Sequence, residues 1–263
     1  MAQFVGNLIA VGGWISGKVY SSKVYCFKEE SQEWEEFVKS MPTARFYLSA
    51  ATIQSAIIAS GGVTGVRDGN NVVCATVEVY CSETSQWYTA DPLPAPYYWM
   101  TSVTIAGTCY QLGGINANNN HVATVLYASL TSLVQKTTSP THQSASHTSV
   151  WKTLPDTPLK ACAAASLSGH LITVGGWKGK TSTAALAFRF VAMQVGVSLP
   201  VFPRLYTFLP FTNSWVKTMN WDLPQPRNGC TAVQLSSNTM IVIGGRDRQT
   251  NLTKTVFIGT VTV

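Results

Sequence analysis

The chain has 263 residues and a formal net charge of +6, from 18 Lys and Arg against 12 Asp and Glu. Charged residues make up 11% of the sequence, against about 25% in an ordinary globular domain, which excludes long disordered tails, coiled coils and charge-laced helices. The positive surplus is too small and scattered to indicate nucleic-acid binding. With 20 Gly and 11% aromatic residues, the composition favours short strands joined by tight turns and predicts an all-β fold.

The N-terminal segment MAQFVGNLIAVGGW has no basic region followed by an uninterrupted apolar run, so a secretory signal peptide is not predicted. The longest apolar stretch, LAFRFVAMQVGVSLPVF, contains Arg189 and Gln194 and ends in prolines, which argues against a membrane span. Six cysteines form no CxxC pair, and most lie in apolar runs: Cys26, Cys74, Cys81, Cys109, Cys162 and Cys230. Such cysteines act as small hydrophobic residues, and we expect a reduced, cytoplasmic location.

Internal repetition is the strongest signal in the sequence. A doubled glycine follows an apolar run five times, at Gly12-Gly13, Gly61-Gly62, Gly113-Gly114, Gly175-Gly176 and Gly244-Gly245, with spacings of 49, 52, 62 and 69 residues. After each of the first four pairs come a tyrosine in a strand-like run, a tryptophan and a Pro turn. The tyrosines are Tyr25, Tyr80, Tyr127 and Tyr206, the tryptophans are Trp34, Trp87, Trp151 and Trp215, and the turns are MPTAR, LPAPY, LPDTP and LPQPR.

This order resembles the kelch repeat, whose unit of about 50 residues forms one four-stranded propeller blade. The resemblance covers nearly the whole chain and implies a kelch-type β-propeller in a single domain over residues 1–263. It has about five blade units, at approximately residues 1–40, 41–91, 92–154, 155–221 and 222–263. Because the first and last units are incomplete, the chain is either a five-bladed ring with an imperfect seam or a fragment of a six-bladed ring.

Two segments are longer than the repeat requires. The polar run TSLVQKTTSPTHQSASHTS lies between the Tyr and Trp strands of the third unit and is interpreted as a disordered surface loop. Residues 186–204 lengthen the fourth unit between its second and third strands. That apolar insert is either a partner-binding segment or an unspliced piece of a gene model.

Residues that could carry chemistry are sparse. The four histidines lie in loops or turns: His121, His142, His147 and His170. No HExxH or GxSxG motif occurs, and the acidic cluster in KEESQEWEE is typical of a solvated hairpin. Copper radical oxidases, the propeller enzymes most similar to kelch proteins, need Tyr and His copper ligands and a Tyr–Cys crosslink, which cannot be recognised here. We therefore predict no enzymatic activity, no metal and no cofactor.

The distribution of charge distinguishes the two faces expected of a propeller. Loops between second and third strands share one face with the linkers between blades. That face receives 12 cations and five anions, a net +7, and the rest of the chain is −1. Trp14 and Trp177 follow glycine pairs on this face. In the turn LPAPY and directly after it, Tyr97, Tyr98 and Trp99 either belong to the same surface or pack between blades.

Kelch propellers commonly bind partner peptides on this face, and the resemblance implies a contact role for the turn arginine. Arg45 in MPTAR and Arg227 in LPQPR match that arginine, whereas the third unit has Tyr97 and the fourth has Pro158 or Leu159. The residues expected to contact a partner are Arg45, Tyr97, Arg227, Trp14, Trp177, Arg67, Arg246 and Arg248. Arginine and aromatic residues are enriched at interface hot spots.

The sequence thus predicts a non-enzymatic scaffold or adaptor module for protein binding, in the cytoplasm. It would hold an acidic or phosphorylated partner segment on the basic loop face, without nucleic acid or membrane as a partner. The alternative is a galactose-oxidase-like or glycan-binding propeller.

Overall fold

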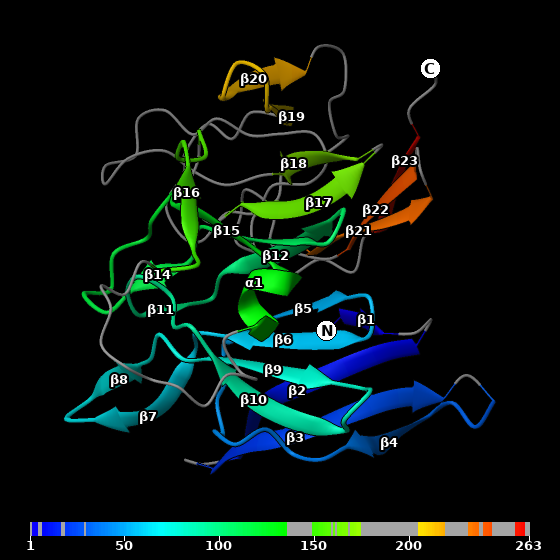
Figure 1. The fold of residues 1–263 in the computed structure, drawn as a ribbon, viewed down its shortest axis with the longest axis vertical. Helices are drawn as coiled ribbons and strands as arrows, with labels where there is room; N and C mark the ends of the chain where they lie inside the picture. Colours follow the sequence, from blue (N-terminus) through cyan, green and yellow to red (C-terminus); the bar gives the residue numbers. More distant parts are fainter. Residues whose placement is uncertain are drawn as a thin grey trace. The chain divides into compact units, whose positions relative to one another are not determined.

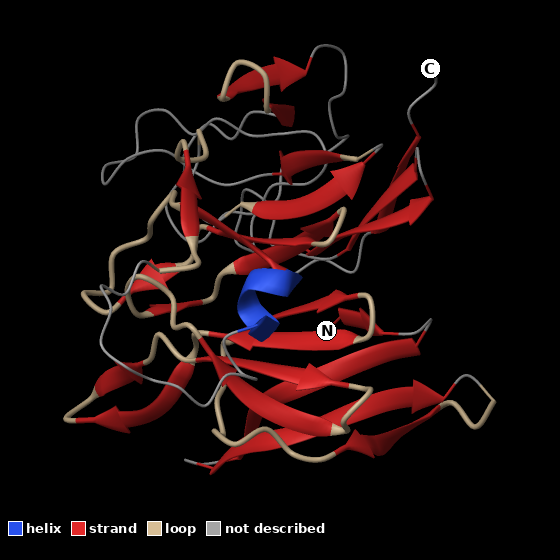
Figure 2. Ribbon diagram, viewed as in Figure 1, coloured by secondary structure: helices blue, strands red, loops and turns tan. Residues whose placement is uncertain are grey.

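The computed structural model describes residues 2–4, 7–16, 19–28, 30–135, 149–158, 160, 162–167, 169–174, 205–218, 231–236, 239–243 and 256–260. These residues form mainly β-strands, and they include one short helix, α1 (Leu130–Gln135) (Figure 2). The all-β prediction is therefore confirmed. No helix in this part of the chain is long and apolar enough to cross a membrane.

The chain divides into two compact units. The first comprises Met1–Gln111, Ile115–Asn120 and Leu126–Lys152, and the second comprises Leu112–Gly114, His121–Val125 and Thr153–Val263. A single domain over residues 1–263, with the blade boundaries given above, stays a prediction.

The strands form four-stranded sheets in chain order (Figure 1). The first sheet contains β1 (Ala2–Phe4), β2 (Asn7–Ser16), β3 (Val19–Lys28) and β4 (Glu33–Val38). The second contains β5 (Ser49–Ile53), β6 (Ala56–Ser60), β9 (Val77–Cys81) and β10 (Gln86–Ala90). The third contains β12 (Thr101–Ile105), β13 (Thr108–Leu112), β15 (Val125–Ser129) and β16 (Lys152–Leu154).

Two short antiparallel pairs and two further sheets complete the described strands. The pairs are β7 (Val63–Arg67) with β8 (Asn70–Val73), and β11 (Tyr97–Tyr98) with β14 (Ile115–Asn116). The fourth sheet contains β17 (Ala163–Leu167), β18 (His170–Val174), β19 (Leu205–Leu209) and β20 (Ser214–Thr218). The fifth contains β21 (Thr231–Ser236), β22 (Thr239–Ile243) and β23 (Val256–Thr260).

The first strands of successive sheets are neighbours, as in the blades of a propeller. In the first unit β5 lies beside both β1 and β12, and in the second unit β17 lies beside β21. The strand before each described glycine pair is the second of its sheet, and every residue of β6 is buried. Such burial on both faces is what the uninterrupted apolar run IIASGG predicts.

Three of the four repeat tryptophans donate a hydrogen bond to the linker that precedes their own blade. The indole N–H of Trp87 donates to the carbonyl of Lys39 at 2.7 Å, that of Trp151 to Asp91 at 3.0 Å, and that of Trp215 to Pro155 at 3.0 Å. Each hydrogen bond satisfies a linker carbonyl and fixes the linker against the outer strand.

These bonds correct the alignment of the linker that precedes the fourth unit. The acceptors Lys39, Asp91 and Pro155 each lie two residues before a buried residue: Met41, Leu93 and Thr157. Each of those three donates its backbone N–H to an earlier carbonyl, of Ser22, Ala75 and Ala123 respectively. The sequence position equivalent to Arg45 is therefore Ala161, and the prediction of Pro158 or Leu159 is wrong.

The strand register also corrects the alignment of the repeat aromatics. The rings that pack on repeat tryptophans are Phe27 on Trp34, Tyr80 on Trp87 and Phe208 on Trp215, with centroids 5.4, 5.6 and 5.3 Å apart. All three precede their tryptophan by seven residues. Across their sheets, Tyr25 instead pairs with Ala10, and Tyr206 pairs with Thr173. This is the strand position that Glu78, paired with Ala59, occupies in the second sheet. Tyr127 stacks on Tyr110, 6.0 Å between centroids.

The glycine pairs let a linker approach the end of the second strand. Gly12 has φ +61°, and a Cβ there would lie 2.7 Å from the carbonyl oxygen of Arg45. The Gly13 N–H donates to the same carbonyl at 2.8 Å, and Gly62 donates to Tyr97 in the same way. Gly113 and Gly114 also have positive φ; Gly175, Gly176, Gly244 and Gly245 lie outside the described residues.

The polar segment of the third unit is not wholly a loop. Its first residues belong to α1, where Ser129 Oγ accepts the backbone N–H of Ser132 at 3.1 Å and so caps the helix. Leu133 is buried in the same core cluster as Leu126 and Trp151. The prediction of a disordered loop is thus wrong for the helical part, because an apolar residue anchors it. Residues 136–148 and the insert at residues 186–204 lie outside the described residues.

Candidate functional site, an aromatic loop surface

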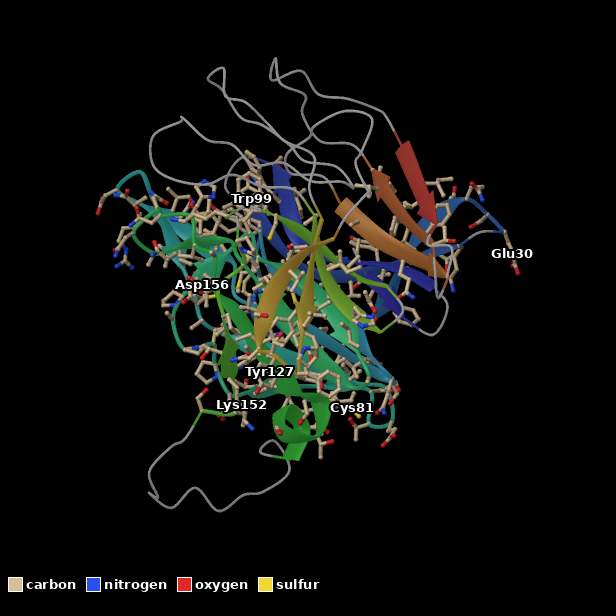
Figure 3. All side chains as sticks on the ribbon, turned by 90° about the horizontal axis from the view of Figure 1, so that it is seen from above. Glu30, Cys81, Trp99, Tyr127, Lys152 and Asp156 are labelled. Atoms are coloured by element: carbon tan, nitrogen blue, oxygen red, sulfur yellow. The ribbon has the colours of Figure 1, made fainter. Side chains whose placement is uncertain are left out.

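The loop face predicted to bind partners lies at one end of the strands. Figure 3 shows Trp99 at one end of the first unit, and Tyr127, Cys81 and Lys152 toward the other. Cys81 ends β9 and Lys152 begins β16, so these two residues lie at hairpins between third and fourth strands. Trp99 lies in the second inter-blade linker. This separation agrees with the expected alternation of connections.

Arg45 does not point outward. Its side chain is 0% exposed, and its Nη2 lies 2.8 Å from Oε2 of Glu78, which is 1% exposed. Nη1 donates to the carbonyls of Gly61 and Thr76, each at 2.9 Å. Thr43 Oγ1 donates to the other carboxylate oxygen of Glu78 at 2.6 Å.

The buried ion pair changes the role expected of Arg45. Its guanidinium bridges the linker to β6 and β9, and its charge is balanced by Glu78. A second acidic group from a partner would have to displace a hydrogen-bonded carboxylate from a site without water access. The prediction that Arg45 contacts a partner is wrong, because Arg45 is committed to the sheet.

An exposed cluster of aromatic rings occupies the same face of the first unit. We call it the aromatic surface, and it consists of Trp14, Tyr20, Phe46, Tyr47, Tyr98 and Trp99. Phe46 and Tyr98 are buried, whereas Trp14 is 62%, Trp99 53% and Tyr47 47% exposed. Of the two readings of the third-unit turn, Tyr98 therefore packs inside and Trp99 belongs to the surface.

Ring contacts join the cluster into one surface. The rings of Tyr47 and Trp99 stack with centroids 5.6 Å apart and planes 18° apart. Tyr47 also packs against Phe46 at 4.7 Å, and Phe46 lies 6.4 Å from Trp14. Beneath them Phe46 stacks on Tyr20 at 4.7 Å.

Equivalent backbone positions present the two stacked rings. Phe46 pairs with Val63 and Tyr98 with Ile115, so Tyr47 and Trp99 occupy the same position in successive linkers. Both residues have a left-handed backbone conformation, with φ of 53° for Tyr47 and 60° for Trp99. The backbone N–H of Trp99 donates to the backbone carbonyl of Tyr47 at 2.8 Å. A bulky residue in this region costs about 1–3 kcal/mol, and such strain is concentrated at functional sites.

The structure places the other predicted partner residues separately. Arg67 is exposed at the end of β7, beside the Asp68-Gly69 turn that the segment RDGNN predicts. Tyr97 is partly buried in β11, packs against a core cluster and accepts the Gly62 N–H through its carbonyl. Trp177, Arg227, Arg246 and Arg248 lie outside the described residues.

The sequence analysis missed Tyr47, Phe46 and Tyr20. A signal for the first two was present, because MPTARFY and LPAPYYW align without a gap and place an aromatic pair after the turn in both linkers. Tyr20 has no equivalent signal. It lies on the β2–β3 hairpin opposite Trp14.

No group of three or more metal-ligating side chains forms within the described residues. Burial raises the pKa of the Cys109 thiol to about 12 and that of Cys162 to about 11, which makes both poor nucleophiles. Burial, with Lys160 nearby, lowers the pKa of His121. These groups are dispersed in the repeat rather than gathered on the aromatic surface.

Comparison with known proteins agrees with the repeat architecture. A family model of the Kelch motif matches residues 44–94, which run from one Pro turn to the next. Kelch-like protein 38 of Danio rerio is 29% identical over 110 residues, 41% of this chain and 19% of that protein. Kelch-like protein terF of Aspergillus terreus is 27% identical over 249 residues, 92% of this chain and 47% of that protein.

The match to the solved structure of YjhT covers 98% of this chain and 80% of the YjhT chain, with a TM-score of 0.69 and 14% sequence identity. This is a likeness in fold alone. These comparisons support a kelch-repeat protein, and the fold is that of a kelch-type β-propeller. The chain spans less than half the length of the curated relatives quoted above. Similarity to kelch-repeat proteins suggests a module for protein–protein interaction in general.

Proposed function

We propose that this chain is a non-enzymatic protein-interaction module that holds a partner segment on the aromatic surface of its loop face. The observation that carries the proposal is the stacked pair Tyr47 and Trp99, each about half exposed and each at a positive φ. Glycine would occupy both positions without strain. Retaining two large rings there is unfavourable for folding alone and suits a contact surface.

The charge of the partner is a second part of the proposal. With Arg45 paired to Glu78, the cations proposed to meet an acidic or phosphorylated segment are Arg67, Arg227, Arg246 and Arg248. They would act through charge-assisted hydrogen bonds. A cytoplasmic location belongs to the same proposal.

Glycine substitution of the strained pair tests the function. The variants Tyr47→Gly and Trp99→Gly should unfold within about 1 kcal/mol of the parent, because relief of backbone strain offsets the lost ring contacts. A display library of random peptides would be selected on the parent chain. Selected peptides should bind both variants at least about tenfold more weakly.

The matched control is Phe211→Ala, which removes a fully exposed ring from the turn between β19 and β20 in the second unit. Binding should survive this change. If selected peptides bind the glycine variants as tightly as the parent, the aromatic surface is not the interaction site.

A further inference from the structure

The chemistry of the aromatic surface indicates what part of a partner it contacts. None of its six residues carries a charge. Among described residues within two positions of them, Arg45 is the one charged side chain, and Glu78 neutralises it. The rings themselves therefore offer a ligand apolar contacts and hydrogen bonds to neutral groups.

Two neutral donors remain available on the exposed rings. The Tyr47 hydroxyl and the Trp99 indole N–H make no hydrogen bond with other described residues. The Tyr98 hydroxyl, in contrast, donates to Asn119 Oδ1 at 2.8 Å. The surface thus offers ring area together with donors, and it suits a ligand with apolar rings and unpaired acceptors.

Two side-chain amide oxygens in the neighbouring Asn-rich loop already accept hydrogen bonds. Asn116 Oδ1 accepts the backbone N–H groups of Asn118 and Asn120, each at 3.0 Å. Asn119 Oδ1 accepts from Tyr98. Sugar hydroxyls need many side-chain partners that both donate and accept, and these amide oxygens are committed to the loop itself. The arrangement favours a peptide over a carbohydrate.

Resting on the proposed function, we propose that the partner segment lying on the aromatic surface is a proline-rich stretch in the polyproline II conformation. Such a segment has no internal hydrogen bonds, so its carbonyls are free to accept from Tyr47 and Trp99. Its pyrrolidine rings pack on aromatic faces. Because the conformation is already populated before binding, little ordering entropy is lost when the segment binds to these uncharged rings.

Calorimetric titration with a short poly-L-proline peptide tests the proposal, with a Gly-Ser peptide of equal length as the flexible comparison. The parent should bind poly-L-proline and not the Gly-Ser peptide. Tyr47→Gly and Trp99→Gly should each weaken that binding at least about tenfold, while Phe211→Ala should leave it unchanged. Thermal melts of every variant establish that the protein tested is folded.

The other outcomes separate this inference from the proposed function. If poly-L-proline does not bind, but an acidic peptide binds and is lost in the glycine variants, the inference is overturned and the proposed function stands. If neither poly-L-proline nor the acidic peptide binds, but a neutral oligosaccharide binds to the same rings, the inference and the proposed function are both overturned. Equal binding of poly-L-proline to parent and glycine variants overturns the inference as well.

Discussion

The Arg45→Ala substitution removes the cation from a buried ion pair and leaves its partner in place. Glu78 would keep one hydrogen bond, from Thr43, inside a sheet where it is 1% exposed. The carbonyls of Gly61 and Thr76 would each lose a donor. Removing one member of a buried pair typically costs about 3–5 kcal/mol, because the other charge stays buried without compensation.

That cost is large beside the whole free energy of folding, which is about 5–15 kcal/mol for a typical protein. At about 2–4 °C for each kcal/mol in a domain of this size, we expect Tm to fall by about 10 °C. Urea unfolding followed by tryptophan fluorescence gives the same difference as a shift in midpoint. Arg67→Ala is the matched control, because Arg67 is exposed at a hairpin end and its loss should cost less than about 0.5 kcal/mol.

A double substitution identifies the source of the loss. Arg45→Met with Glu78→Leu removes both charges and fills the space with apolar atoms, which is often neutral for buried pairs. We expect this variant to be more stable than Arg45→Ala, so the two sites should couple strongly in a double-mutant cycle. If Arg45→Ala were as stable as Arg67→Ala, the ion pair would not hold the linker, and the reasoning would be refuted.

Two further properties follow from burial and from the insert. Because the folded state raises the Cys109 pKa from 9.0 to about 12, an alkylating reagent at mildly alkaline pH should modify partly exposed Cys74 and Cys81 first. The same shift means that the free energy of unfolding should fall as pH rises past about 9, because the unfolded thiol ionises there and the folded one does not. Rapid labelling of Cys109 in the native protein would contradict the protection of this thiol by burial. Deleting residues 187–204 should leave thermal stability unchanged or raise it, because a loop is shortened and apolar surface removed. A loss of several kcal/mol in the melting experiment would instead place the insert in the core.

The spacing of the glycine pairs was enough to predict the blades, because a left-handed glycine at the end of an apolar strand is a local requirement. The aromatic register was not predictable in the same way. Tyr25 and Phe27 lie two residues apart, so both side chains point to one face of β3 and either could be the ring on Trp34. The pairing across the sheet decides between them.

The fate of Arg45 depends on a residue 33 positions later in the chain. A lone carboxylate in the apolar run VEVY was a sequence signal for a buried charge, since such a group needs a cation. Which cation it takes depends on how the linker packs against β9, and that is a tertiary property. Only part of the aromatic surface could be predicted from local sequence. The repeat of the linker predicts Tyr47 and Trp99, whereas Trp14 and Tyr20 reach the surface from a hairpin through tertiary packing.

Arg227 occupies the same position as Arg45 in the last Pro turn, but the sheet that follows differs. Glu78 pairs with Ala59, two residues before Gly61, and Phe257 pairs with Val242, two residues before Gly244. At the strand position of Glu78, the blade that follows Arg227 therefore has an aromatic residue in place of the carboxylate. We expect Arg227→Ala to unfold like the parent and to weaken binding of an acidic peptide about tenfold or more. Arg227→Lys should recover little, because an ammonium cannot form the bidentate contact. A melt that falls as far as that of Arg45→Ala, with no change in peptide affinity per folded molecule, would show instead that both turn arginines are structural.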